Sequence, residues 1–132
     1  MPTLEQQLEW WTKQANHDIE IARSNRANGF HDGCALMCQQ ATEKFLKALY
    51  MKQMQSTSPK THNCEHLATL LQAPADVIDA SRLVESDYME ARYPDAAQGV
   101  PFELFDDDDS EKRIEATSRV QQWVSQQLNP NP

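Results

Sequence analysis

The chain has 132 residues, a length typical of one domain with its own hydrophobic core, and we expect a single domain with a core from about residue 4 to residue 128. Its formal net charge of −8 excludes a broadly basic protein that wraps duplex DNA. It lacks an apolar run of transmembrane length, a secretory signal pattern and a disulfide framework among its three cysteines, so we expect a cytoplasmic protein.

Hydrophobic periodicity predicts two long helices in the first half of the chain. The first covers residues 3–27, with apolar positions that recur on one helical face: Leu4, Leu8, Trp11, Ala15, Ile19 and Ala22. Gly29 ends this helix, because glycine accepts the left-handed conformation. The second helix runs from residue 31 or 32 to residue 54, with Asp32 as a candidate N-cap. The short linker predicts an antiparallel hairpin.

Prolines and loop composition divide the second half into shorter elements. We predict helices over residues 64–72 and 75–92, each ended by a proline that follows closely. Residues 95–105 have loop composition, and a last helix begins between residues 107 and 110 and reaches about residue 127. No segment alternates as a strand does. The sequence therefore predicts an all-α, up-and-down bundle of four to five helices.

Three polar side chains share one stripe of the second helix. Gln40, Lys44 and Lys47 have the spacing i, i+4, i+7 beside the apolar face. A lysine there can extend its ammonium to a phosphate or carboxylate while its stem stays buried. The alternative is a solvated stripe with an ordinary helical ion pair between Glu43 and Lys47.

The segment before the third helix contains residues that bind metals in other proteins. His62 and His66 are four residues apart, and Cys34 and Cys38 repeat that spacing. No closed zinc signature is present, and both of these cysteines lie on the predicted core face. We therefore predict buried thiols, no metal site and no cofactor. Thr61 is a candidate cap for the third helix.

Two arginines occur where they could contact a phosphate. Arg92 precedes Tyr93 and Pro94, which predict a rigid corner at a helix end. Arg92 there either satisfies terminal carbonyls or holds a phosphate or a partner carboxylate. Arg26 and His31 form an Arg-x4-His pattern that could bind a phosphodiester and move a proton.

Five ordered segments resemble the HEPN domain family. They are ANHDIEIA from Ala15, GFHDGCA from Gly29, QQATEKFLKAL from Gln39, THNCEHL from Thr61 and EARYPD from Glu90. A Gln-x-x-Glu-Lys-x-x-Lys-Ala helix, a Thr-His segment and an Arg-Tyr-Pro corner mark one branch of that family. The resemblance extends from about residue 8 to residue 127.

The resemblance implies a bundle of about five helices that is usually dimeric and often encoded beside a small nucleotidyltransferase, in pairs that look like toxin–antitoxin modules. Many members of the family are metal-independent ribonucleases with a late Arg-x4-6-His motif. This chain has no histidine after His66, so it lacks that motif. The departure favours a non-enzymatic module.

We therefore expect a HEPN-like module that binds a nucleotide, RNA or a protein partner and forms a homodimer, with a small nucleotidyltransferase as a candidate partner. The residues expected to contact an anion are Lys44, Lys47, His62 and Arg92. The residues expected to complete the structural motif are Gln40, Glu43, Tyr93 and Pro94. Two alternatives remain open. One is a ribonuclease with an atypical site built from Arg26, His31 or His62, and the other is a purely structural interaction protein.

Overall fold

Helices account for all regular secondary structure in residues 1–130, the part of the chain that the computed structural model describes. Within that part, five helices exceed a single turn and three consist of one turn each. In chain order they are α1 (Leu4–Ala27), α2 (His31–Met54), α3 (Cys64–Leu70), α4 (Ala75–Glu85), α5 (Asp87–Glu90), α6 (Pro94–Ala97), α7 (Pro101–Leu104) and α8 (Asp107–Leu128).

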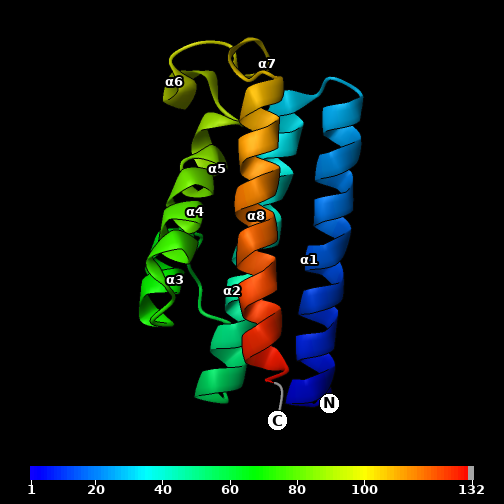
Figure 1. The fold of residues 1–132 in the computed structure, drawn as a ribbon, viewed down its shortest axis with the longest axis vertical. Helices are drawn as coiled ribbons and strands as arrows, with labels where there is room; N and C mark the ends of the chain where they lie inside the picture. The colour runs from blue at the N-terminus through cyan, green and yellow to red at the C-terminus, as the bar shows by residue number, and fades with distance from the viewer. Residues whose placement is uncertain (131–132) are drawn as a thin grey trace.

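Consecutive long helices alternate in direction (Figure 1). α1 and α2 form the antiparallel hairpin expected from their short linker, and their contact is the most extensive in the fold. α4 runs back along the bundle, and α8 returns beside α2 and α4. The start of α1 and the end of α8 therefore lie at the same end of the molecule. The predicted all-α, up-and-down bundle of four to five helices is confirmed.

Side-chain capping explains where the first and last helices begin. Thr3 accepts a hydrogen bond from the backbone N–H of Gln6, whose side chain accepts one from the backbone of Thr3 in return. Asp106 and Asp109 form the same reciprocal arrangement at the start of α8, which begins at Asp107, within the predicted range of residues 107–110. Gly29 adopts a positive φ of 80° after α1, which confirms its predicted role.

Two predicted caps are wrong. Asp32 lies in the first turn of α2, and Phe30 occupies the N-cap position without any side-chain hydrogen bond. Asn63 caps α3 by accepting a hydrogen bond from the backbone N–H of His66, whereas Thr61 bonds only to the backbone N–H of Asn63. In both cases the N-cap, the residue immediately before the first helical one, lies two positions from the predicted residue.

The predicted helix over residues 75–92 is wrong in its second half, because it divides at Ser86 into α4 and α5. The break precedes Asp87, whose fully buried carboxylate binds the guanidinium of Arg113 on α8 at 2.6 and 3.2 Å. Helical periodicity reports only on residues within a few positions of one another, whereas Asp87 contacts a residue of α8 that is distant in sequence. The sequence pattern therefore did not reveal the break that occurs next to this ion pair.

The connection between α5 and α8 is more ordered than its composition predicted. Residues 95–105 were expected to form a loop, yet they lie largely within α6 and α7. Pro94 and Pro101 each occupy the first helical position, where a fixed φ favours helix initiation and the missing N–H costs no bond. α3 ends at Leu70, two residues before the predicted end, and Gln72 then has a φ of 56°.

The hydrophobic core is built around α2, of whose 24 residues thirteen are buried. α1 packs against it with Ala15, Ile19 and Ala22, as the periodicity predicted. Small side chains there allow a short distance between the helix axes. The helical spacing of the apolar residues in α3 and α4 predicts Leu70 and Leu83 in the core, but they are 46% and 37% exposed. No helix within residues 1–130 combines the length and hydropathy needed to cross a bilayer.

Candidate functional site

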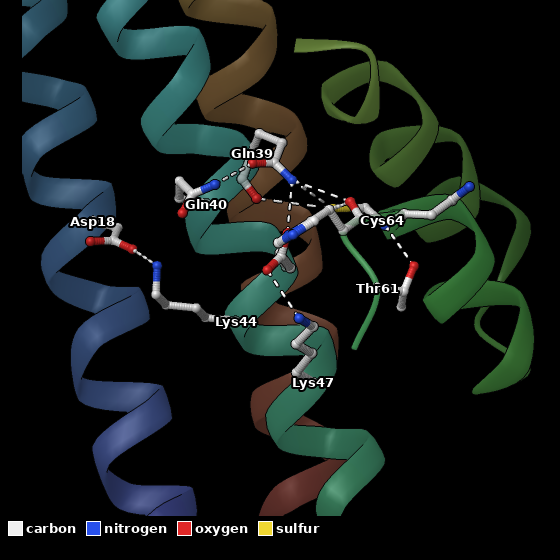
Figure 2. A network of polar contacts seen from close by, with 10 residues as sticks. Asp18, Gln39, Gln40, Lys44, Lys47, Thr61 and Cys64 are labelled. Atoms are coloured by element: carbon white, nitrogen blue, oxygen red, sulfur yellow. Dashed lines mark hydrogen bonds and ion pairs between the residues drawn. The ribbon is translucent and has the colours of Figure 1, made fainter. Parts of the chain in front are cut away.

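A buried carboxylate, Glu43 of α2, is the centre of a polar network between α2 and the segment before α3 (Figure 2). Its Oε1 accepts a hydrogen bond from Gln39 Nε2 at 3.1 Å and lies 3.0 Å from His62 Nδ1. Its Oε2 accepts one from Lys47 Nζ at 3.1 Å. The expected helical ion pair between Glu43 and Lys47 is present, but Lys47 is only 6% exposed, so the pair is buried and not part of a solvated stripe. Removal of one partner from such a buried pair is costly.

Gln39 extends the network to the backbone and to the next side chain. Its Nε2 also donates to the carbonyl of His62 at 3.3 Å, and its Oε1 accepts from Gln40 Nε2 at 2.6 Å. Sequence reasoning selected Gln40 and missed Gln39, which is fully buried. A signal was available, because Gln39 follows the predicted core residue Cys38 and lies beside the apolar face. Within residues 1–130, every buried side-chain nitrogen and oxygen has a hydrogen-bond partner.

A second buried carboxylate, Asp18 of α1, holds Lys44. Asp18 is 2% exposed, and its Oδ2 accepts a hydrogen bond from Lys44 Nζ at 2.7 Å. Its Oδ1 accepts from Gln14 Nε2 at 2.9 Å. Sequence reasoning missed Asp18, although it falls inside the apolar stripe of α1, immediately before Ile19. A charged residue at a core position of a helix is a signal for a buried partner.

His62 and Arg92, which come from two segments distant in sequence, both contact the ring of Tyr88 on α5. The His62 and Tyr88 rings stack, with centroids 4.4 Å apart and an interplanar angle of 15°. The guanidinium carbon of Arg92 lies 4.7 Å from the Tyr88 ring centroid. The His62 side chain is 57% exposed, and Arg92 is exposed as well. The segment before α3 and the end of α5 thereby form one surface.

Arg92 keeps its hydrogen-bonding capacity for other partners. Among residues 1–130, no carboxylate lies within ion-pair distance of its guanidinium, and no terminal carbonyl accepts a hydrogen bond from it. The interpretation that Arg92 satisfies the end of its own helix therefore does not hold. Tyr93 is 46% exposed, and Pro94 begins α6, so the Arg-Tyr-Pro corner lies at the surface.

Arg26 and His31 lie together near the start of α2, against the start of α8. Arg26 binds Asp107 through Nε at 2.9 Å and Nη2 at 3.1 Å. The Nδ1 of His31 lies 2.7 Å from the hydroxyl of Ser110, which is fully buried. The hydrogen bond with Arg26 lowers the pKa of Asp107. Both side chains thus join α8 to the α1–α2 hairpin.

His62 does not belong to that cluster. Its partner Glu43 is twelve positions after His31 on the same helix, a separation of roughly 18 Å at the helical rise. Of the three predicted acid–base candidates, the structure therefore brings Arg26 and His31 to one place and His62 to another.

Cysteines and histidines occur at metal-compatible spacings in α2 and around the start of α3. In residues 1–130, no group of three or more histidine, cysteine or acidic side chains is arranged to hold a metal ion. Cys34, Cys38 and Cys64 are free and buried, as expected for the first two. A hydrogen bond with Cys38 lowers the pKa of the Cys34 thiol to about 7, and burial strongly raises the pKa of Cys64.

The chain is similar to a known domain family and to solved structures over most of its length. The family model of the HEPN domain matches residues 8–127. The solved structure of ST0689, an archaeal HEPN homologue, has a TM-score of 0.80 and 31% identity over 98% of this chain and 100% of that chain. TT1696 from Thermus thermophilus shares the fold, with a TM-score of 0.84 at 22% identity over 92% of this chain and 98% of that one. No curated protein sequence matches significantly. The chain belongs to the HEPN domain family.

Proposed function

We propose that this HEPN domain is a non-catalytic module that binds the phosphate groups of a nucleotide at the surface of exposed His62 and Arg92, with Lys44 and the largely buried Lys47 as supporting contacts. The observation that carries the proposal is the stack of His62, Tyr88 and Arg92, which is anchored to buried Glu43. Arg92 presents donors in a planar fork that matches phosphate oxygens. The stack orients that fork before any ligand arrives, which reduces the entropy lost on binding.

The four residues contribute unequally. Lys44 and Lys47 are balanced by Asp18 and Glu43, so neither adds net positive charge to the surface. Their ammonium groups retain hydrogen atoms for further acceptors, since each can donate three hydrogen bonds. Arg92 supplies the positive charge that lacks a partner within residues 1–130, and exposed His62 lies one ring away. Arg92 should therefore dominate binding, and the lysines should support it.

Partner binding is the second part of the proposal, and a separate observation favours it. Val100, Phe102 and Leu104 in and before α7 are 42%, 68% and 52% exposed. Exposed apolar side chains grouped in one segment are typical of a protein–protein contact. The proposed partners are a second copy of the chain and a small nucleotidyltransferase in a toxin–antitoxin type pair, within the cytoplasm. The family resemblance supports these partners.

The geometry disfavours the alternative of a ribonuclease that uses Arg26 and His31. Arg26 is bound by Asp107 and lies 3.8 Å from Glu111, within an acidic run that opposes the approach of a phosphodiester. The hydroxyl partner of His31, on Ser110, is fully buried and has no access to RNA.

Isothermal titration with pyrophosphate, ATP, GTP and short single-stranded RNA tests the proposal. We expect heat with pyrophosphate and the nucleotides, and Arg92→Ala should weaken binding by about 1.5–3 kcal/mol, the usual contribution of a charged hydrogen bond. Arg23→Ala is the matched control, because Arg23 is an exposed arginine on α1 with only a long 3.9 Å contact to Glu20. Absence of heat with every ligand, or an equal loss in both variants, would contradict the proposal.

A further inference from the structure

A surface hollow of about 270 Å³ lies where α1 passes α2, and the proposed phosphate surface does not use most of it. Its lining residues are Trp10, Trp11, Gln14 and Lys44. Trp10 is 56% exposed, and Trp11 is partly buried. Because two adjacent indoles line the same hollow, its wall is mainly aromatic, and an aromatic wall that is open to solvent can stack against a ligand.

The polar side of the hollow is held in a fixed position by one buried group. Gln14 and Lys44 both donate hydrogen bonds to the carboxylate of Asp18, at 2.9 and 2.7 Å. The Asp18 side chain is only 3% exposed, so it acts as an anchor beneath the hollow. Gln14 still offers its Oε1 as an acceptor and its second amide hydrogen as a donor, and Lys44 retains two ammonium hydrogens. Within residues 1–130, no other side chain or backbone group uses them.

These features define the chemistry of the ligand. Two indoles favour a flat aromatic ring, because stacking on aromatic side chains is favourable for every base. The Asp18–Lys44 pair is neutral overall, so the hollow does not select a charged group. The positioned amide and ammonium instead suit a ring whose edge carries both donors and acceptors. A volume of about 270 Å³ is slightly below the roughly 300–1,000 Å³ of drug-sized ligand sites, which fits one ring system better than a whole nucleotide.

We propose that the hollow binds the base of a nucleotide, stacked on Trp10 with its edge against Gln14 and Lys44. This inference rests on the proposed function, in which phosphate groups contact the surface that leads to Arg92. Lys47 connects the two parts, since its ammonium lies 5.9 Å from the centroid of the Trp11 ring and binds Glu43 of the network. Lys44 belongs to the hollow and to the proposed phosphate site, because it lines the hollow and is one of the four proposed anion contacts.

Tryptophan fluorescence with ligands that lack phosphate tests the base site by itself. Adenosine, guanosine and cytidine should quench emission of the wild-type protein in a saturable manner that changes little with salt, since these nucleosides carry no net charge. Trp10→Ala should weaken nucleoside binding roughly tenfold, and Trp10→Phe should retain most of it because a ring remains. Phe30→Ala is the control, because Phe30 is an aromatic residue that is 62% exposed near the start of α2.

Parallel titration with pyrophosphate and AMP separates this inference from the proposed function. Nucleoside binding without pyrophosphate binding supports the base site and contradicts the phosphate surface. AMP binding that Trp10→Ala leaves unchanged, with no quenching by nucleosides, overturns the base site and supports the phosphate surface. If nucleosides do not quench and Trp10→Ala converts a dimer to a monomer in sedimentation velocity, the hollow holds a second copy of the chain and the inference is wrong.

Discussion

Two regions of this protein contain an arginine and a histidine that the sequence marked for phosphate chemistry, and their surroundings differ. At the start of α8, Arg26 binds Asp107 and His31 lies against buried Ser110. In the other region, between α2, α3 and α5, Arg92 and His62 flank Tyr88 and stay exposed. At the start of α8 the arginine and the histidine join helices, whereas beside Tyr88 they remain open to a ligand. The partners available nearby, rather than the residue types, decide between these roles.

Removal of the carboxylate beneath the second region should have the largest effect. Glu43→Ala leaves the buried ammonium of Lys47 without its carboxylate and removes one of the acceptors of the Gln39 amide. We expect a loss of about 3–5 kcal/mol in the free energy of unfolding, measured by urea denaturation. The double variant Glu43→Leu, Lys47→Met should recover much of it, because a pair of apolar residues needs no charge compensation. Equal losses in the single and double variants would show that packing, and not the unpaired charge, was responsible.

The region around the start of α8 should respond to pH through Asp87. Burial raises the pKa of Asp87 from its ordinary 3.8 to about 6, while the hydrogen bond with Arg113 acts in the opposite direction. The folded protein therefore binds this proton more tightly than the unfolded chain does, so its contribution to stability is present at low pH and is lost as pH rises from about 4 through about 6. The change is up to about 3 kcal/mol at 1.36 kcal/mol per pKa unit.

Urea denaturation of the wild type and of Asp87→Asn across that pH range measures this contribution. The amide does not titrate, so the part of the pH dependence that Asp87 causes should vanish in the variant. Glu90 and Asp109, which also raise the pKa of Asp87, remain in both proteins and leave the comparison valid. Identical pH profiles would show that the carboxylate of Asp87 has an ordinary pKa.

The smallest effects should follow substitutions of the other arginine and histidine pair. Arg26→Ala and His31→Ala should leave pyrophosphate affinity unchanged, because the polar groups of both side chains are already bound to Asp107 and Ser110 of α8. Neither the wild type nor these variants should cleave structured or single-stranded RNA in gel assays. RNA cleavage by the wild type that His31→Ala abolishes would reverse the comparison and identify the start of α8 as a catalytic site.

The helical fold and most of its core could be predicted from the sequence. Apolar residues at helical spacing, Gly29 and the prolines predicted five of the helices and placed Ala15, Ile19 and Ala22 against α2. These features depend on residues within a few positions of one another, so a single sequence contains them. The family motif also identified Glu43 and Lys47, although it did not show that they are buried.

Which charges are compensated depends instead on the tertiary structure. Lys44 meets Asp18 across 26 positions, and His62 meets Glu43 across 19, and neither pairing follows from helical periodicity. The break at Ser86 likewise accompanies the contact of Asp87 with Arg113, 26 positions away. A lysine that is compensated by a carboxylate offers a ligand hydrogen bonds but no net charge. The four predicted anion contacts therefore comprise one open arginine, one exposed histidine and two neutralised lysines, Lys44 by distant Asp18 and Lys47 by Glu43 on its own helix. Local pattern builds the helices, and the packing between them determines what their polar residues can do.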